Sequence, residues 1–289
     1  MKTSAVNYRK VQVEGLNIFY REAGQKDAPV VLLLHGYPTS SHMYRNLIPI
    51  LSEKYHVIAP DLIGFGFSDA PHYKSFNYTF DNLTKYMQGF VDLLGLKRFA
   101  IQVFDYGAPV GFRLAVANPE KITGIISQNG NAYEEGLSGG WEPIQKYWAE
   151  PTEENRNNLK GMSTAETTQW QYFTGVSDKS LVAPESYSLD QFFLDRDENG
   201  EIQLDLFKDY ATNVALYPTF HKYFKESQVP LLAVWGDKDP FFLPPGAEAF
   251  KKDLPNAIVK FFDTGHFALE THVNEIGEEI LTFLATLRK

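Results

Sequence analysis

Residues 99–111 read Phe-Ala-Ile-Gln-Val-Phe-Asp-Tyr-Gly-Ala-Pro-Val-Gly, and this stretch decides the fold class. Its first six residues, Phe99–Phe104, form a short and mostly apolar run, which predicts a buried β-strand. A helix is expected from about Pro109 to Ala117, and the small residues at 107 and 108 let it approach the strand closely. Asp105 is therefore a polar residue between the end of a buried strand and the start of a helix.

On both sides of this segment, short apolar runs alternate with helical patterns. Strands are expected at residues 11–20, 30–35, 57–60, 122–127, 229–235 and 257–262, and helices at 78–94 and 275–287. This alternation is typical of an α/β fold with a parallel sheet covered on both faces. The stretch 131–226 breaks the pattern, because it is polar, rich in Trp, Tyr and Gln, and without a convincing strand. We predict a core of residues 1–130 and 227–289 with a mostly helical cap, residues 131–226, inserted in it.

The composition indicates an ordinary globular protein of 289 residues, 44% hydrophobic and 22% charged. A net charge of -9 disfavours nucleic acid and anionic membranes as partners. The chain has no cysteine and no metal-ligand spacing, so we expect no metal and no organic cofactor. Met1–Gly15 lacks the apolar segment of a secretory signal, and apolar runs such as Val30–Leu34 are too short to cross a bilayer. We expect a cytoplasmic monomer or homodimer.

Three further strand ends carry residues that suit catalysis together with Asp105. His35-Gly36-Tyr37-Pro38 follows the strand at 30–35, and the backbone N–H groups of Tyr37 and Tyr106 are candidates for an oxyanion hole. Gly236-Asp237-Lys238-Asp239-Pro240 follows the strand at 229–235. Asp263-Thr264-Gly265-His266-Phe267 follows the strand at 257–262.

Each of these pieces also has a plain structural interpretation. Asp105 is a possible cap for the following helix, and the acids and histidine are possible surface residues. All of them nevertheless occur at strand ends, in the order nucleophile, acid, histidine. That order predicts a catalytic triad of Asp105, an aspartate at 237 or 239, and His266.

With these motifs the chain resembles the α/β-hydrolase superfamily over essentially its whole length. Asp61-Leu-Ile-Gly-Phe-Gly-Phe-Ser68-Asp69 is similar to the segment after the fourth strand in that family, which implies a structural role for Ser68. An aspartate at the nucleophile position resembles the branch that holds epoxide hydrolases and haloalkane dehalogenases. The resemblance implies a mostly parallel, doubly wound sheet of eight strands with a helical cap, and it selects Asp239 as the acid.

The residues that hold the leaving group separate the two activities of this branch. Haloalkane dehalogenases usually have Trp after the nucleophile, and many have Asn in the HG-x-P loop, where this chain has Tyr106 and Tyr37. Epoxide hydrolases often have an aromatic residue in that loop, although they too usually have Trp after the nucleophile. Asn213–Trp235, in contrast, resembles the return from cap to core in dehalogenases. We expect an epoxide hydrolase, with a haloalkane dehalogenase as the alternative.

Epoxide hydrolases also use cap tyrosines to protonate the epoxide oxygen, and the candidates in this chain are Tyr133, Tyr172 and Tyr217. The expected partners are a small apolar organic substrate and water. Asp105 would form an alkyl ester, which water activated by His266 would hydrolyse while Asp239 orients the histidine. Two other functions are ranked lower. Hydrolysis of carboxylic esters would make a labile anhydride on Asp105, and a non-catalytic receptor would need the pocket but not the triad.

Overall fold

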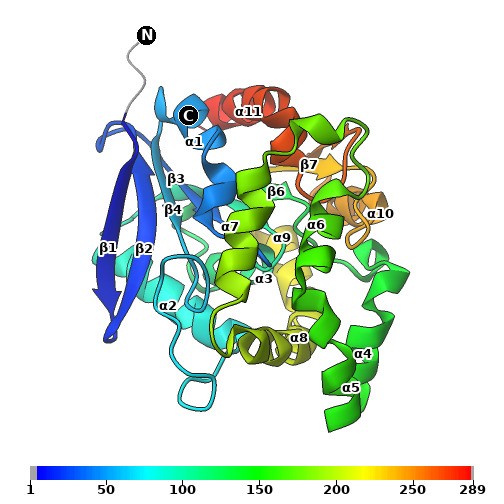
Figure 1. Cartoon of the computed structure of the whole chain (residues 1–289). Coiled ribbons are helices and arrows are strands. Elements are labelled where there is room, and N and C mark those ends of the chain that lie inside the picture. The colour runs from blue at the N-terminus through cyan, green and yellow to red at the C-terminus, as the bar shows by residue number, and fades with distance from the viewer. Residues whose placement is uncertain (1–4, 288–289) are drawn as a thin grey trace.

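The computed structural model describes residues 5–287, so the first four residues of the Met1–Gly15 stretch and the last two of the chain lie outside it. One eight-stranded sheet runs through the molecule (Figure 1). In spatial order its strands are β1 (Asn7–Val13), β2 (Leu16–Ala23), β4 (His56–Pro60), β3 (Val30–Leu34), β5 (Phe99–Phe104), β6 (Ile122–Gln128), β7 (Leu231–Gly236) and β8 (Ile258–Phe262). Strand β2 pairs antiparallel with β1 and β4, and the other pairs are parallel.

The central strands are buried on both faces, which explains their nearly continuous apolar sequences. Every residue of β5 and β7 is buried, and in the register Leu32 of β3 pairs with Ile58 on one side and Ile101 on the other. Because these strands are parallel, their carboxyl ends meet at one edge of the sheet. That edge is where a ligand site is expected in an open α/β sheet.

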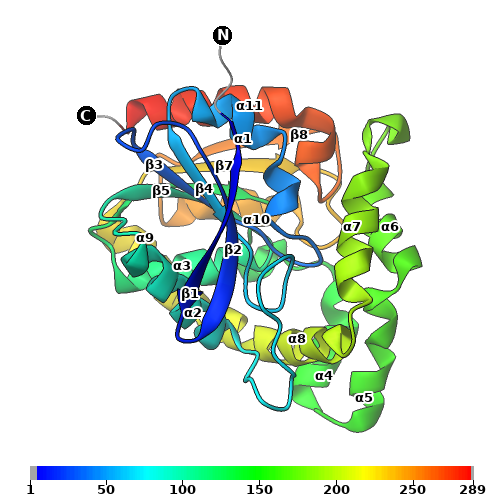
Figure 2. The same cartoon turned by 60° about the vertical axis from the view of Figure 1, so that its left-hand side comes forward.

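Helices cover both faces of the sheet (Figure 2). Helices α2 (Phe80–Leu93), α3 (Gly107–Ala117), α9 (Tyr217–Ser227) and α10 (Pro244–Ala249) share one hydrophobic cluster with the sheet. Helices α1 (Leu47–Ser52) and α11 (Ala268–Thr286) share the other cluster. The predicted eight-stranded, doubly wound architecture is therefore confirmed.

The segment between β6 and β7 is helical and contains no strand in its described residues. It holds α4 (Glu142–Ala149), α5 (Glu153–Asn158), α6 (Ala165–Phe173), α7 (Pro184–Leu194) and α8 (Asn199–Ala215), joined by short 3-10 turns. Helix α9 also falls within 131–226, but Phe220 and Phe224 of this helix pack on Phe112 of α3, with ring centroids 5.5 Å apart in both pairs. Helix α9 thus lies in the core layer, whereas α4 to α8 form what we call the cap.

Two elements differ from the sequence-based expectation. Residues 11–20 form parts of two strands, because Glu14 (φ 45°) and Gly15 (φ 88°) make a two-residue hairpin turn between β1 and β2. The closing helix begins at Ala268 instead of Glu275, and it is kinked at His272. Within residues 5–287, no helix combines the length and apolar character needed to cross a bilayer.

Candidate active site

Asp105 lies at the sharp turn between β5 and α3, in a left-handed backbone conformation with φ 46°. That conformation is uncommon for a residue with a side chain, and Asp tolerates it better than most. The turn also needs small neighbours. A Cβ at Gly107 would collide with the Leu34 carbonyl, and one at Gly36 would collide with the Asp105 side chain. The small residues around Asp105 therefore allow a sharp turn that places this carboxylate at the carboxyl edge of the sheet.

The two oxygens of Asp105 have different surroundings. Oδ1 accepts hydrogen bonds from the backbone N–H groups of Tyr37 and Tyr106, each at 2.6 Å. Oδ2 has no hydrogen-bond donor among the described residues and lies 3.9 Å from His266 Nε2. The N-cap position of α3 is Tyr106, so Asp105 does not act as a simple helix cap. One oxygen is thus held in a pair of N–H donors and the other is available to react.

His266 and Asp239 come from the loops after β8 and β7. His266 Nδ1 lies 2.7 Å from Asp239 Oδ2, and both side chains are buried. Asp239 Oδ1 accepts from the backbone N–H groups of Phe241 (2.7 Å) and Phe242 (3.2 Å). Because a carboxylate only accepts, it holds the proton on His266 Nδ1 and leaves Nε2 free as a base facing Asp105. Asp237 is exposed, and Asp239 is the aspartate that contacts His266.

Burial and charge shift the pKa values of this group. Burial raises the pKa of Asp105 to about 6, although the His266 charge and the two backbone N–H groups act in the opposite direction. Burial by itself would lower the pKa of His266, but the charge and hydrogen bond of Asp239, together with the charge of Asp105, outweigh it and raise that pKa. A carboxylate whose pKa is about 6 is ionised at neutral pH, as a nucleophile must be, and a raised pKa makes His266 a stronger base.

The sequence analysis missed Asn129, which follows β6 and is fully buried. Its Nδ2 donates to Asp239 Oδ2 at 2.7 Å, and its Oδ1 accepts from the Gly236 N–H at 3.1 Å. Asn129 also has a left-handed backbone (φ 45°), a conformation that Asn adopts more readily than most residues. A polar residue with that preference at one more strand end was the signal that could have identified it.

The three predicted cap tyrosines do not line the cavity at Asp105, so this expectation is corrected. Tyr133 donates to Asp253 Oδ2 at 2.8 Å, and Tyr172 donates to Asp190 Oδ2 at 2.5 Å. The Tyr217 hydroxyl accepts from Asn131 at 3.2 Å. A buried phenol stabilises the fold only if its hydroxyl finds a partner, and each of these has found one elsewhere.

A small cavity lies directly over Asp105 and His266, with a volume of about 20 Å³. That is on the order of the space one buried water needs. Its walls are mostly aromatic and aliphatic, formed by Tyr37, Tyr106, Trp141, Ile144, Met162, Phe207 and Phe241, with Gln171 as an additional polar residue. The surroundings of the Asp105 carboxylate and of His266 are therefore mostly apolar.

The indole N–H groups near this cavity already donate hydrogen bonds to backbone carbonyls. Trp141 donates to the Phe241 carbonyl at 3.1 Å, and Trp148 donates to the Phe207 carbonyl at 2.6 Å. Trp235 donates to the Phe242 carbonyl at 2.8 Å. The remaining one, Trp170, is 48% exposed and does not line the cavity. Two indole donors facing Asp105, the arrangement that would hold a halide, do not occur.

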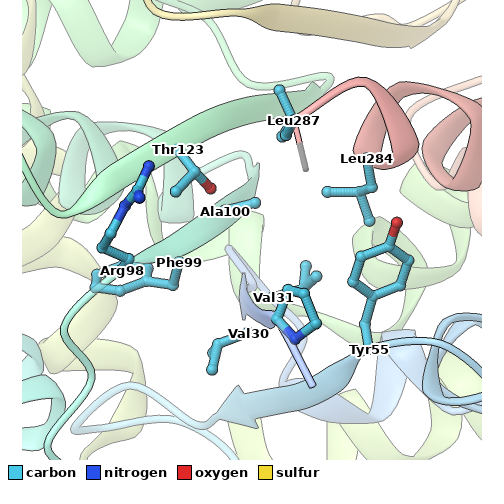
Figure 3. A pocket seen from close by; sticks show the side chains of 10 residues that line it. Val30, Val31, Tyr55, Arg98, Phe99, Ala100, Thr123, Leu284 and Leu287 are labelled. Atoms are coloured by element: carbon cyan, nitrogen blue, oxygen red, sulfur yellow. The ribbon is translucent and has the colours of Figure 1, made fainter. Parts of the chain in front are cut away.

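A different pocket, of about 270 Å³, opens at the amino ends of β3, β5 and β6 (Figure 3). Its described lining includes Arg98, Thr123 and Tyr55 but no carboxylate or histidine. It therefore lies at the edge of the sheet opposite to Asp105 and lacks a nucleophile–base pair. Within residues 5–287 there is also no group of three or more His, Cys, Asp or Glu residues placed to hold a metal ion.

Ser68, which the sequence resemblance assigned to structure, is tied to the backbone of the core. Its hydroxyl donates to the Asp61 carbonyl at 2.7 Å and accepts from the Phe19 N–H at 2.9 Å. His221 stacks on Tyr133, with ring centroids 4.2 Å apart, and its Nε2 lies 2.8 Å from the Ala132 carbonyl oxygen. Neither residue lines the cavity at Asp105.

Comparison with known proteins identifies the family of the chain. Residues 29–273 match the family model described as alpha/beta hydrolase fold. An uncharacterized hydrolase of Saccharomyces cerevisiae is 44% identical over 290 residues, which cover 99% of each chain. A haloalkane dehalogenase of Bradyrhizobium diazoefficiens is 40% identical over 124 residues, which cover 43% of this chain and 39% of that protein.

Among solved structures, a haloalkane dehalogenase from Bradyrhizobium elkani has a similar fold, with a TM-score of 0.80. It is 24% identical and covers 98% of this chain and 99% of that one. The chain belongs to the α/β-hydrolase fold family and is a hydrolase related to haloalkane dehalogenases.

Proposed function

We propose that this α/β-hydrolase opens small apolar epoxides to diols through an ester on Asp105. The observation that carries the proposal is the unequal treatment of the two Asp105 oxygens. Oδ1 is held by two backbone N–H groups, whereas Oδ2 faces the cavity beside His266. A serine hydrolase needs its base to activate the nucleophile, but an ionised carboxylate attacks carbon without one.

In the first step, Asp105 Oδ2 attacks a ring carbon of the epoxide. A new C–O bond forms to Asp105, the ring C–O bond breaks, and its electron pair moves to the epoxide oxygen. That alkoxide takes one proton from water, which gives a hydroxyalkyl ester of Asp105 and leaves one hydroxide. The apolar walls formed by Trp141 and Phe207 keep competing water away from the carbon.

In the second step, water attacks the ester carbonyl while His266 Nε2 takes its proton. The carbonyl oxygen is Oδ1, so the N–H groups of Tyr37 and Tyr106 already point at the atom that becomes the oxyanion. Asp239 stabilises the charged His266. Collapse breaks the ester C–O bond, and His266 returns the proton to the departing alcohol. Asp105 then loses a proton to the hydroxide left by the first step and regains its carboxylate.

The choice of an epoxide over a halide rests on the leaving-group side of the cavity. Three of the four indole N–H groups donate to backbone carbonyls and the fourth lies outside the lining, so no indole is available for a halide. The second candidate function is hydrolysis of carbon–halogen bonds. It is favoured by the 40% identity to a haloalkane dehalogenase over 43% of this chain.

One variant tests both candidates, because attack by Asp105 needs no base whereas hydrolysis of the ester does. His266→Ala is expected to keep the first step and to lose the second by about 10³-fold or more. Intact-protein mass spectrometry should then show a stable adduct with 1,2-epoxybutane, equal to the mass of the epoxide. A haloalkane would instead add its mass less that of hydrogen halide.

Asp105→Ala in the same background is the matched control, and it should form no adduct. An adduct that persists in this control would mean that another residue is the nucleophile. An adduct from 1-bromobutane and none from 1,2-epoxybutane would replace the epoxide proposal with the dehalogenase one.

A further inference from the structure

Gln171, on cap helix α6, lines the cavity over Asp105 and His266. It is 1% exposed, and its Nε2 has no hydrogen-bond partner among the described residues. Burying an amide donor without a partner is unfavourable, so such a group is uncommon in a native protein and calls for an explanation. A ligand that accepts this hydrogen bond inside the cavity would provide one.

Most other donors on the cavity wall already have acceptors. The Tyr37 hydroxyl donates to the Met162 carbonyl at 2.7 Å, and the Trp141 indole donates to the Phe241 carbonyl. The Tyr106 hydroxyl is also buried without a partner, but Tyr106 belongs to the core and not to the cap. Its ring packs edge-on against Phe65 and Phe80. Gln171 is therefore the free donor that the cap contributes to this cavity.

Helix α6 is fixed against the loop that carries His266. Tyr172 stacks on Phe267, with ring centroids 3.8 Å apart and planes within 4° of parallel. At the end of the helix, a Cβ at Gly265 would collide with the Thr174 carbonyl, so the two backbones touch. The neighbours of Gln171 and His266 are thus in direct contact, and the amide is held in place relative to the reacting groups.

We propose that Gln171 Nε2 donates a hydrogen bond to the epoxide oxygen while the ring opens, an assignment that rests on the proposed function. The amide does not give up its proton. It stabilises the negative charge that develops on oxygen when Asp105 attacks, and water then supplies the proton. This donor takes the place of the cap tyrosines, whose hydroxyls are bonded elsewhere. The stabilisation matters most when the departing oxygen is strongly basic.

The test measures the rate of ester formation by intact mass in the His266→Ala background, with 1,2-epoxybutane and with epichlorohydrin. The chlorine of epichlorohydrin withdraws electrons and makes the departing alkoxide less basic. Gln171→Met, which keeps the volume but removes the donor, should slow alkylation by 1,2-epoxybutane on the order of 10²-fold. The loss with epichlorohydrin should be several-fold smaller, and Gln171→Asn should recover part of the rate.

Gln203→Met is the matched control, because Gln203 is another fully buried cap glutamine that does not line the cavity. It should alkylate at the parental rate with both epoxides. Equal losses with both epoxides in the Gln171 variants, or a parental rate in Gln171→Met, would overturn the assignment. If Tyr106→Phe shows the dependence on alkoxide basicity and Gln171→Met does not, the donor is Tyr106. If the parent forms no adduct with either epoxide, the proposed function itself fails, and this inference fails with it.

Discussion

The two walls of the cavity differ in how their polar groups are satisfied. On the core wall, Asp105 Oδ1 holds two donors, and Asp239 accepts from His266, Asn129 and two backbone N–H groups. On the cap wall, Gln171 offers a donor with no acceptor. The polar groups that position Asp105 and His266 are thus paired before any substrate arrives, whereas the Gln171 amide of the cap wall, like the Tyr106 hydroxyl of the core wall, is not. Variants in the core should therefore change how fast the reaction runs, and variants in the cap should change which molecule reacts.

The largest expected effect on the core wall comes from Asp239→Asn. All four hydrogen bonds to Asp239 are donated to it, so an amide places an NH₂ group against donors whichever way it turns. His266 then loses the partner that fixes its tautomer, and hydrolysis of the ester should fall by about 10⁴-fold. Stopped-flow and quenched-flow kinetics should show a burst of ester formation at the wild-type rate, followed by very slow release.

The burst distinguishes a defect in the base from a collapsed site. If ester formation slows as much as ester hydrolysis does, the hydrogen bonds of Asp239 also support the position of Asp105. In that case the proposed division, with Asp105 forming the ester and His266 and Asp239 hydrolysing it, is wrong.

A smaller effect is expected for Asn129, which touches the acid but not the reacting atoms. Asn129→Gly removes the hydrogen bond to Asp239 Oδ2 and tolerates the left-handed backbone, so it should lower the hydrolytic rate about tenfold. Asn129→Asp keeps an acceptor for the Gly236 N–H but sets a second carboxylate beside Asp239. This added charge should raise the pKa of His266 and move the alkaline-rising limb of the pH–rate profile to higher pH. An unshifted limb in Asn129→Asp would show that Asn129 serves only the fold.

The contrast between core and cap also explains what could be predicted from the sequence. Asp105, Asp239 and His266 each follow a buried apolar strand, and parallel strands bring such ends to one edge of the sheet whatever the details of packing. The backbone N–H groups of Tyr37 and Tyr106 that hold Asp105 Oδ1 follow from the same logic, because the turns fix their positions. Local sequence patterns were therefore sufficient for the fold, and they placed Asp105, Asp239 and His266 at one edge of the sheet, although they did not identify Asn129.

The cap residues that line the cavity are not marked by a comparable sequence pattern. Which face of α6 meets the cavity depends on contacts of residues far away in the sequence, such as Tyr172 with Asp190 and Phe267. From the sequence, Tyr172 and its neighbour Gln171 are equally plausible cavity residues. Tertiary packing places Gln171 in the cavity lining. Asn129 was missed for a related reason: its role depends on a hydrogen bond to a residue 110 positions further along the chain.

The smallest effect on turnover is expected at the cap residue Asp190, which bonds Tyr172 beside Gln171. Burial raises the pKa of Asp190 to about 7, from an ordinary value of 3.8. Nearby Glu270 raises it further, while the Tyr172 hydrogen bond and the Arg45 charge lower it. Between these two pKa values the folded protein holds a proton on Asp190 that the unfolded chain has released. Its contribution to the free energy of unfolding is therefore largest below about pH 4 and is lost as the pH rises to 7.

Asp190→Asn removes this dependence, because its amide stays neutral and its oxygen still accepts the hydrogen bond from Tyr172. The variant should gain stability relative to the wild type as the pH rises from 5 to 8, by about 1–3 kcal/mol. That difference corresponds to a Tm increase of roughly 2–6 °C, measured by calorimetry or circular dichroism at both pH values. Turnover should change less than twofold, since Asp190 does not line the cavity. A Tm difference between variant and wild type that is the same at pH 5 and pH 8 would mean that Asp190 is ionised in the folded cap throughout this range.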